Sequence, residues 1–433
     1  MTPGLLTQVQ VQSLDGLFGG LVGMMQIAGG VKGFVHYLAP RLQSPRQALL
    51  ATWLTLAVTF VAPTFRLVMV GPILRELKDR LRLSGLLLGY ILDVSSVPPV
   101  VLLPVGTAFA GYMVAVLEAA LRDNELVGDA YGLFLQSIPY NFFAWAMLAI
   151  GLFITFTSTS GRPRSETGAY QAGNWQFMQR YDQRGESAAA RARRDLHELG
   201  LKEELAAVRP RPLNLVVVLA ALLLFTAGLF YLEGLRTGAD SVLAAFIQAD
   251  AVHILLLGTL LTVLAAFPFY LLRGVPFHEL LYHFFDGANR LARTIVLLVL
   301  VWSLSRLSQQ LGLHDFVVRQ LRFVPAAWVP VTLFLVSSAF GYFIGSSWGT
   351  WGLLMPLGIS IVRATNGPLA ATVGAVFAGG TFGSLVSPLG DTTITTAALL
   401  DLKPMEHARH KLPTALLALA VAAVFYIGAG LRG

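Results

Sequence analysis

Long runs without a charged side chain constrain this sequence more than any other feature. Lys, Arg, Asp and Glu are absent from residues 213–232, 251–272 and 412–431, and from the longer runs 323–362 and 364–390. An α-helix needs about 20 apolar residues to cross the hydrocarbon of a bilayer, and most of the runs reach that length. They do not alternate as the strands of a membrane β-barrel would. The pattern predicts an all-α, polytopic membrane protein of about ten segments.

Composition supports this fold class. Only 55 of the 433 residues are charged, 31 basic and 24 acidic, and 55% are hydrophobic. This balance excludes an ordinary cytosolic enzyme, a disordered chain and a fibrous repeat. The net charge of +7 is typical of basic cytoplasmic loops. We therefore expect a multi-pass protein of the cell (inner) membrane, not an enzyme, with the lipid bilayer as partner and no nucleic acid.

The charges gather in one segment that divides the chain. Residues 159–212 hold 17 of the 55 charged side chains, and the positive-inside rule places this loop in the cytoplasm. We predict a first transmembrane repeat over 1–158, a cytoplasmic basic loop over 159–212 and a second transmembrane repeat over 213–433.

The two halves end in a similar order. Each has a long apolar element that is broken by Ser, Pro or Gly and carries one acid, Asp93 in the first half and Asp391 in the second. One more span closes each half. This order is typical of transporters built from two inverted repeats with broken or re-entrant helices. The first repeat is shortened, since nothing in it corresponds to the spans at 213–232 and 251–272. Chance similarity between apolar sequences is the alternative.

Asp93 and Asp391 are the main candidates for chemistry. A charged side chain at the centre of a membrane helix costs about 2.5–3.5 kcal/mol on insertion scales, and it persists where it serves an ion or a cavity. Helix breaks free backbone carbonyls, which together with hydroxyls and a carboxylate suit Na⁺ or H⁺. The alternative is that each Asp caps a helix at the membrane surface. The candidate ligands, with Na⁺ assigned to the two acids, are Asp93, Ser95, Ser96, Ser384, Ser387, Asp391, Thr392 and Thr393.

A second candidate segment is the Gly/Ser/Trp-rich stretch 345–352. We interpret it as a helix break that exposes the hydroxyls of Ser346, Ser347 and Thr350 to the site. The alternative is helix packing through small residues beside an interfacial Trp belt.

The pair His407 and His410 could suggest a metal site. Because Lys403, Arg409 and Lys411 are close in sequence, we interpret the stretch as a basic interfacial loop. The chain has no cysteine, so disulfides and thiolate metal sites are excluded. We expect no cofactor, with Na⁺ and H⁺ entering only as transported ions.

These motifs resemble the NhaC-type sodium/proton antiporter family of the ion-transporter superfamily. The resemblance rests on Gly345-Ser-Ser-Trp-Gly-Thr, on Ser387-Pro-Leu-Gly-Asp-Thr-Thr-Ile394 and on Tyr90-Ile-Leu-Asp-Val-Ser-Ser. It implies secondary active transport, with inverted repeats whose broken helices meet at a central ion site. The resemblance also implies that the leading spans of that pattern are missing, and we expect the chain to begin inside the first repeat.

The sequence departs from the family pattern in its acids. Where the family has an acidic pair before the first-half Gly-Pro segment, this chain has Phe60-Val-Ala-Pro-Thr-Phe-Arg66, and Ser384 stands near the place of another acid. Fewer carboxylates reduce the capacity for protons and cations. Arg66 would instead attract an organic anion such as a carboxylate.

Na⁺/H⁺ exchange is the leading hypothesis, with Asp391 as ion ligand and proton acceptor. Transport of a small organic anion, with Arg66 as ligand, is the alternative within transport. An intramembrane aspartyl protease would need the carboxylates of Asp93 and Asp391 to pair. A transport-dead membrane subunit would account for the missing acids. The sequence leaves it open whether the protein forms a homodimer.

Overall fold

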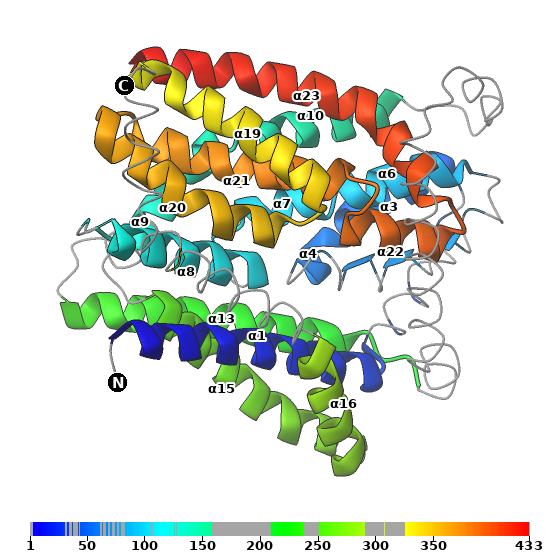
Figure 1. Ribbon diagram of the computed structural model, residues 1–433. Coiled ribbons are helices and arrows are strands. Elements are labelled where there is room, and N and C mark those ends of the chain that lie inside the picture. The colour runs from blue at the N-terminus through cyan, green and yellow to red at the C-terminus, as the bar shows by residue number, and fades with distance from the viewer. Residues whose placement is uncertain are drawn as a thin grey trace.

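The computed structural model is helical throughout the part of the chain that it describes (Figure 1). The described residues are 3–157, apart from scattered positions between 31 and 82 and residues 105, 106, 125 and 127, then 209–237, 251–290, Leu307 and 325–432. The predicted basic loop 159–212 lies outside the described residues, except for its last four.

The helices in chain order are α1 (Pro3–Ile27), α3 (Pro45–Leu54), α4 (Leu56–Thr59), α6 (Gly85–Val94), α7 (Val97–Leu102), α8 (Ala108–Asp123), α9 (Ala130–Ser137), η2 (Ile138–Tyr140), α10 (Phe142–Thr157), α13 (Leu213–Thr237), α15 (Ala251–Leu272), α16 (Phe277–Arg290), η3 (Ala326–Trp328), α19 (Val329–Ile344), α20 (Ser347–Thr365), α21 (Leu369–Val386), α22 (Asp391–Leu400) and α23 (Pro404–Arg432).

The prediction of an all-α, polytopic membrane protein is confirmed. Within the described residues, six segments are long and apolar enough to cross a membrane. A seventh is the pair α9 and α10, which bend by 45° across η2. Pro139 lies in η2, where the missing N–H of proline interrupts the helical ladder.

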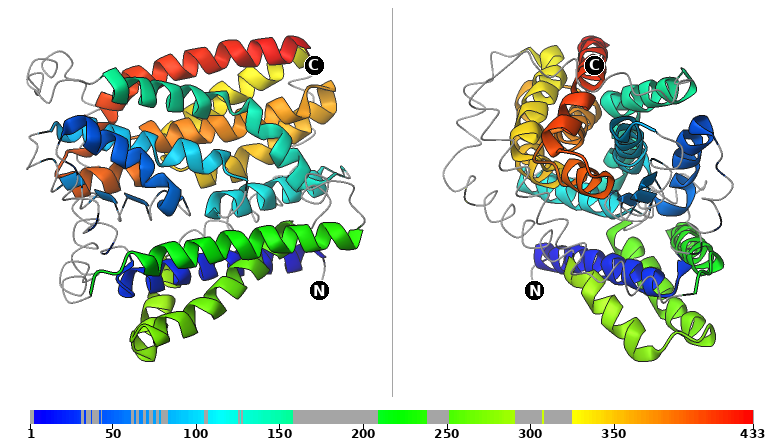
Figure 2. Two further views of the ribbon diagram at one scale, coloured as in Figure 1. Left: turned by 180° about the vertical axis from the view of Figure 1, so that it is seen from behind. Right: turned by 90° about the vertical axis from the view of Figure 1, so that its right-hand side faces the viewer.

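The helices form two parts, visible in all three views (Figures 1 and 2). One part is a bundle of α6–α10 and α19–α23. The other holds α1, α13, α15 and α16, and α8 borders it. Both parts expose large apolar side chains, for example Leu224 on α13 and Phe425 on α23, as helices facing lipid do.

Helix α21 forms the centre of the bundle. Every residue from Ala371 to Val386 is buried, and small residues let α19 approach closely. A Cβ added to Gly383 would lie 2.1 Å from the carbonyl carbon of Gly341, so the two backbones are in direct contact there. The indole of Trp351 on α20 donates to the carbonyl of Phe377 at 3.0 Å. This packing fixes α19, α20 and α21 around the end of α21.

Candidate functional site

Three helix breaks lie in the interior of the bundle, and the first separates α6 from α7. The α6 helix ends at Val94, and Pro98 and Pro99 occupy the first turn of α7, where proline is tolerated. The hydroxyls of Ser95 and Ser96 in this break both donate back to the carbonyl of Leu92, at 3.2 and 2.5 Å. Both serines are buried.

The second break, between α19 and α20, is centred on Gly345. This residue has φ +74°, and a Cβ there would lie 2.7 Å from the carbonyl oxygen of Leu389, so only glycine suits the position. Ser346 then caps α20 by accepting the N–H of Gly349 at 3.3 Å. Since Leu389 belongs to the third break, the second and third breaks are in contact.

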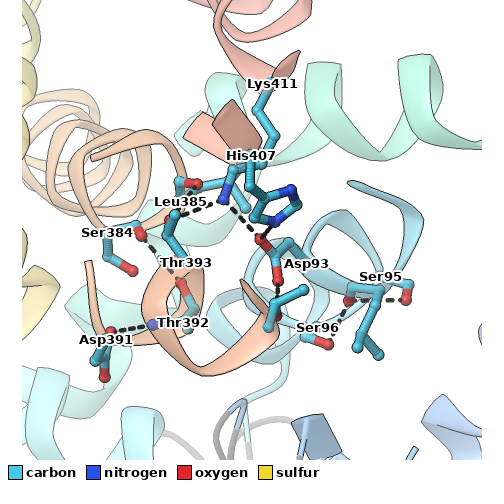
Figure 3. Close-up of polar contacts among 12 residues, drawn as sticks. Asp93, Ser95, Ser96, Ser384, Leu385, Asp391, Thr392, Thr393, His407 and Lys411 are labelled. Carbon is cyan, nitrogen blue, oxygen red and sulfur yellow. Dashed lines mark hydrogen bonds and ion pairs between the residues drawn. The ribbon is translucent and has the colours of Figure 1, made fainter. Parts of the chain in front are cut away.

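The third break separates α21 from α22. Ser387 accepts the N–H of Leu389 at 3.1 Å, and α22 begins at Asp391. The hydroxyls of Thr392 and Thr393 donate to the carbonyls of Ser384 and Leu385, at 3.0 and 3.4 Å. The first turn of α22 is thus joined to the last turn of α21 (Figure 3).

Asp93, on α6, binds side chains from the far end of the chain. Its carboxylate accepts hydrogen bonds from the hydroxyl of Thr396 on α22, from Nε2 of His407 at 2.8 Å and from Nζ of Lys411 at 2.6 Å. All four side chains are buried. Figure 3 shows His407 and Lys411 converging on this carboxylate from α23. Residues four apart share one helix face, so α23 directs both toward α6.

The ammonium of Lys411 has a second partner. It donates to the hydroxyl of Thr393 at 2.8 Å, in addition to Asp93. One buried cation therefore connects the first-half break to the first turn of α22. Removing one member of such a buried pair costs about 3–5 kcal/mol, because it leaves the other charge uncompensated.

The imidazole of His407 is fully buried, and within the described part of the chain it forms one side-chain hydrogen bond, with Asp93. Its Nδ1 has no hydrogen bond among the described contacts. A neutral ring with the proton on Nε2, facing Asp93, fits this arrangement. The ring sits against Gly89, where an added Cβ would lie 2.8 Å from the His407 Cε1 atom. Gly89 thus makes room for the histidine.

Asp391 differs from Asp93 in being exposed among the described residues. It stands within the apolar span 369–400, and its neighbours Gly390 and Thr392 are buried. Its carboxylate accepts the N–H of Thr392 at 2.8 Å, in the first turn of α22, where the helix dipole favours a negative charge. In Figure 3 it lies apart from Asp93, and no hydrogen bond joins the two carboxylates drawn there.

Arg66 is the third buried charge near the breaks. Its Nε donates to Ser96 at 3.0 Å and one terminal nitrogen donates to Ser95 at 2.9 Å. The remaining N–H groups donate to Thr55 and Thr59, at 3.0 and 2.7 Å, and to the carbonyl of Thr52. None of these partners is charged. Arg66 therefore clamps α3 and α4 onto the break between α6 and α7.

The formal charges of these groups balance. Among the described residues the buried Arg, Lys, Asp and Glu side chains are Arg66, Asp93 and Lys411. Together with the exposed Asp391 they amount to two acids and two bases. A bundle interior that combines helix breaks, hydroxyl groups and an accessible carboxylate is typical of ion-transport sites.

The model of the Na⁺/H⁺ antiporter family matches residues 106–431, which is most of the chain and includes the second and third breaks. The chain belongs to the Na⁺/H⁺ antiporter family. The resemblance drawn from the sequence motifs is thereby confirmed, and the protein is a membrane transporter of this family.

Individual relatives extend the comparison. An uncharacterized protein of Haemophilus influenzae is 24% identical over 96% of this chain and 77% of its own length. The Na⁺/H⁺ antiporter NhaC of Bacillus subtilis is 27% identical over 35% of this chain and 34% of its own. The malate-2H⁺/Na⁺-lactate antiporter of that species is 30% identical over 24% of this chain and 22% of its own. The chain therefore matches only parts of the characterised relatives.

A solved structure shares the fold of this antiporter-family chain. The YdaH transporter of Alcanivorax borkumensis, described as having an unusual topology, aligns with a TM-score of 0.58 at 12% identity. The alignment covers 98% of this chain and 87% of that one. At this identity the likeness concerns the fold alone.

The structure corrects the interpretation of residues 345–352. The break is confined to Gly345 and Ser346, and α20 begins at Ser347, because Ser346 provides a cap. The hydroxyls of Ser347 and Thr350 are not exposed, whereas Ser346 is half-buried. Ser347 donates to the carbonyl of Gly380 at 3.1 Å and Thr350 to that of Ser346 at 2.8 Å. Both are buried, so they serve packing in this conformation.

The interpretation of His407–His410 as an interfacial loop is wrong. The stretch is the start of α23, which begins at Pro404, and His407 and Lys411 are the principal partners of Asp93. The basic residues nearby in the sequence favoured a loop at the membrane surface, so the role of His407 and Lys411 was not predicted. The signal that could have found them is the four-residue spacing of His407 and Lys411 directly before an uncharged run.

The other predicted site residues fall into two groups. Ser384, Ser387, Thr392 and Thr393 lie with Asp391 around the third break, as Figure 3 shows for most of them. Ser95 and Ser96 lie near Asp93 but bind Arg66. Arg66 could bind a transported anion only after its five hydrogen bonds to these oxygens had been broken. The assignment of any of these residues to a transported ion stays a prediction.

Proposed function

We propose that this chain is a cation-coupled secondary active transporter that exchanges Na⁺ for H⁺ at Asp391. The observation that carries the proposal is the exposure of this carboxylate at a helix break within an apolar span. Ions that enter the break from water can reach an exposed acid there, and the break offers further oxygens, such as the Ser387 hydroxyl. An ionisable side chain within a membrane span is by default a candidate for a functional site.

Competition for one carboxylate couples the two ions. The ionised Asp391 attracts Na⁺, whereas protonation abolishes the negative charge that the cation needs. A proton bound on one side of the membrane therefore displaces Na⁺, and a Na⁺ gradient drives protons the other way.

Asp93 has a different part in this scheme. Three donors occupy its carboxylate, so a mobile cation could bind there only after the Lys411 ammonium has moved away. In the cation-free state the pair holds α23 and α22 against α6. Because Lys411 also binds Thr393, two residues from Asp391, a cation at Asp391 would repel that ammonium.

Everted membrane vesicles test the proposal. Added Na⁺ should dissipate a pH gradient in vesicles with the wild-type chain, and Asp391→Asn should abolish the response because an amide binds neither Na⁺ nor H⁺ as a carboxylate does. The matched control is Asp401→Asn, since Asp401 is exposed and pairs with Arg75 at the surface. Equal exchange in wild type and Asp391→Asn would reject the role of Asp391.

A second candidate is exchange of a small organic anion. One observation favours it: the partial relatives include a protein named as a malate-2H⁺/Na⁺-lactate antiporter. Uptake of labelled malate and lactate into the same vesicles separates this function from simple cation exchange. If wild-type vesicles transport none of these substances and respond to no cation, the chain is a transport-inactive member.

A further inference from the structure

The guanidinium of Arg66 lies in a cage of oxygen atoms that accept hydrogen bonds from all of its N–H groups. A guanidinium has five N–H groups and no acceptor, and here each N–H meets one oxygen: four hydroxyls and one backbone carbonyl. The side chain has no solvent exposure. Such a cage is a poor anion site, because no N–H remains to bind one.

The hydroxyl protons in this cage point away from Arg66. Thr55 donates to the carbonyl of Thr52 at 2.7 Å and Thr59 to that of Thr55 at 2.6 Å. Ser95 and Ser96 both donate to Leu92. Since a hydroxyl has a single proton, all four present only lone pairs to the centre. A cavity lined only by lone pairs is chemically a cation site.

We propose that this cage is a monovalent-cation site which the chain fills with its own guanidinium. Arg66 is then a tethered ion, and it occupies a place that a mobile cation would otherwise take. The occupant that the emptied cage would take is a free guanidinium ion, because the oxygens match a planar set of N–H donors at 2.7–3.0 Å.

The proposal has a consequence for coupling, which rests on the proposed function. With Arg66 and Lys411 both tethered, the two acids are balanced without a mobile cation. A neutral residue at position 66 would leave the interior one positive charge short. An exchanging variant would then have to bind one more cation to restore that balance.

The test is rescue of an emptied cage by a free cation. Arg66→Ala removes the guanidinium and leaves space, whereas Arg66→Met removes the charge but fills the space. The probe is guanidinium chloride at low millimolar concentration, with urea as a neutral planar control, and the readout is the Tm of the purified full-length chain in detergent. We expect Arg66→Ala to have a lower Tm than wild type.

We further expect guanidinium to raise the Tm of Arg66→Ala saturably by about 2–4 °C and to leave wild type and Arg66→Met unchanged. Urea should have no such effect. An equal rise with urea would show that the cage selects hydrogen-bond donors and not positive charge. No rise with guanidinium would show that the emptied cage does not bind a cation. Either result overturns the proposal.

If Arg66→Ala yields no folded protein, Arg66→Lys decides the matter. A lysine keeps a tethered cation in the cage, so its Tm and yield should exceed those of Arg66→Met. A methionine variant at least as stable as the lysine variant would overturn the proposal. These measurements involve no transport, so their failure leaves exchange at Asp391 untouched, and loss of exchange leaves them valid.

Discussion

At the scale of single residues, Lys411 joins parts of the chain that are far apart in sequence. Its ammonium binds Asp93 and Thr393 and has no solvent exposure. A buried ion pair contributes little to the free energy of unfolding when it is compared with apolar side chains of similar size. Its effect is measured when one member is removed, because the other charge then stays buried without a partner.

Lys411→Met should lower the free energy of unfolding by about 3–5 kcal/mol, since the carboxylate of Asp93 would stay buried with a donor missing. The double variant Lys411→Met/Asp93→Asn should lose less than the single one. Denaturant or thermal unfolding in detergent measures both.

Lys403→Met is the matched control, because Lys403 is exposed and its replacement should change stability by no more than about 0.5 kcal/mol. If the double variant is less stable than Lys411→Met alone, the two charges are not compensating each other.

Sequence reasoning reached Asp93 but not its partners. An acid inside an apolar run is visible locally, whereas His407 and Lys411 follow more than 300 residues later. Their pairing depends on how α23 packs against α6. Nothing in the spacing of charges along the chain specifies that contact.

At the scale of elements, the helix breaks position the polar groups. Gly345 combines a left-handed backbone with contact to Leu389. A side chain there meets both a conformational penalty and a clash with backbone atoms that cannot easily move.

Gly345→Ala should therefore destabilise the chain by about 1–3 kcal/mol or more and reduce any exchange activity, because it pushes the second break away from the third. Gly349→Ala is the control, since its Cβ would meet only the side chains of Ile344 and Ser346 at 3.8 Å or beyond. Tm and vesicle exchange are measured together. Equal behaviour of the two variants would show that the second break does not position the site.

The breaks themselves were predictable. Pro, Gly and Ser within apolar runs predicted interruptions near Asp93 and Asp391, because those residues end helices for local reasons. The extent of each break was less predictable. The cap supplied by Ser346 allows α20 to start within a segment whose composition is poor for a helix.

At the scale of the whole molecule, the proposed exchange requires water to reach Asp391 although most of its span is buried. The absence of cysteine from the sequence makes this testable, since a single introduced thiol has no background.

Asp391→Cys should react with a small, charged thiosulfonate reagent added to intact vesicles or cells, whereas Thr396→Cys, at a buried position on the same helix, should not. Mass spectrometry counts the labelled chains. Labelling of both positions, or of neither, would contradict selective access to the third break.

The balance of two acids by two tethered bases has an electrical consequence. Moving one elementary charge through a membrane potential of 100 mV changes the free energy by about 2.3 kcal/mol. An interior that holds Arg66, Lys411, Asp93 and Asp391, all ionised, carries no net charge when no ion is bound. Where these four groups move together, the voltage across the membrane does little work on the empty protein as it changes conformation, and it acts mainly on the ion-loaded form.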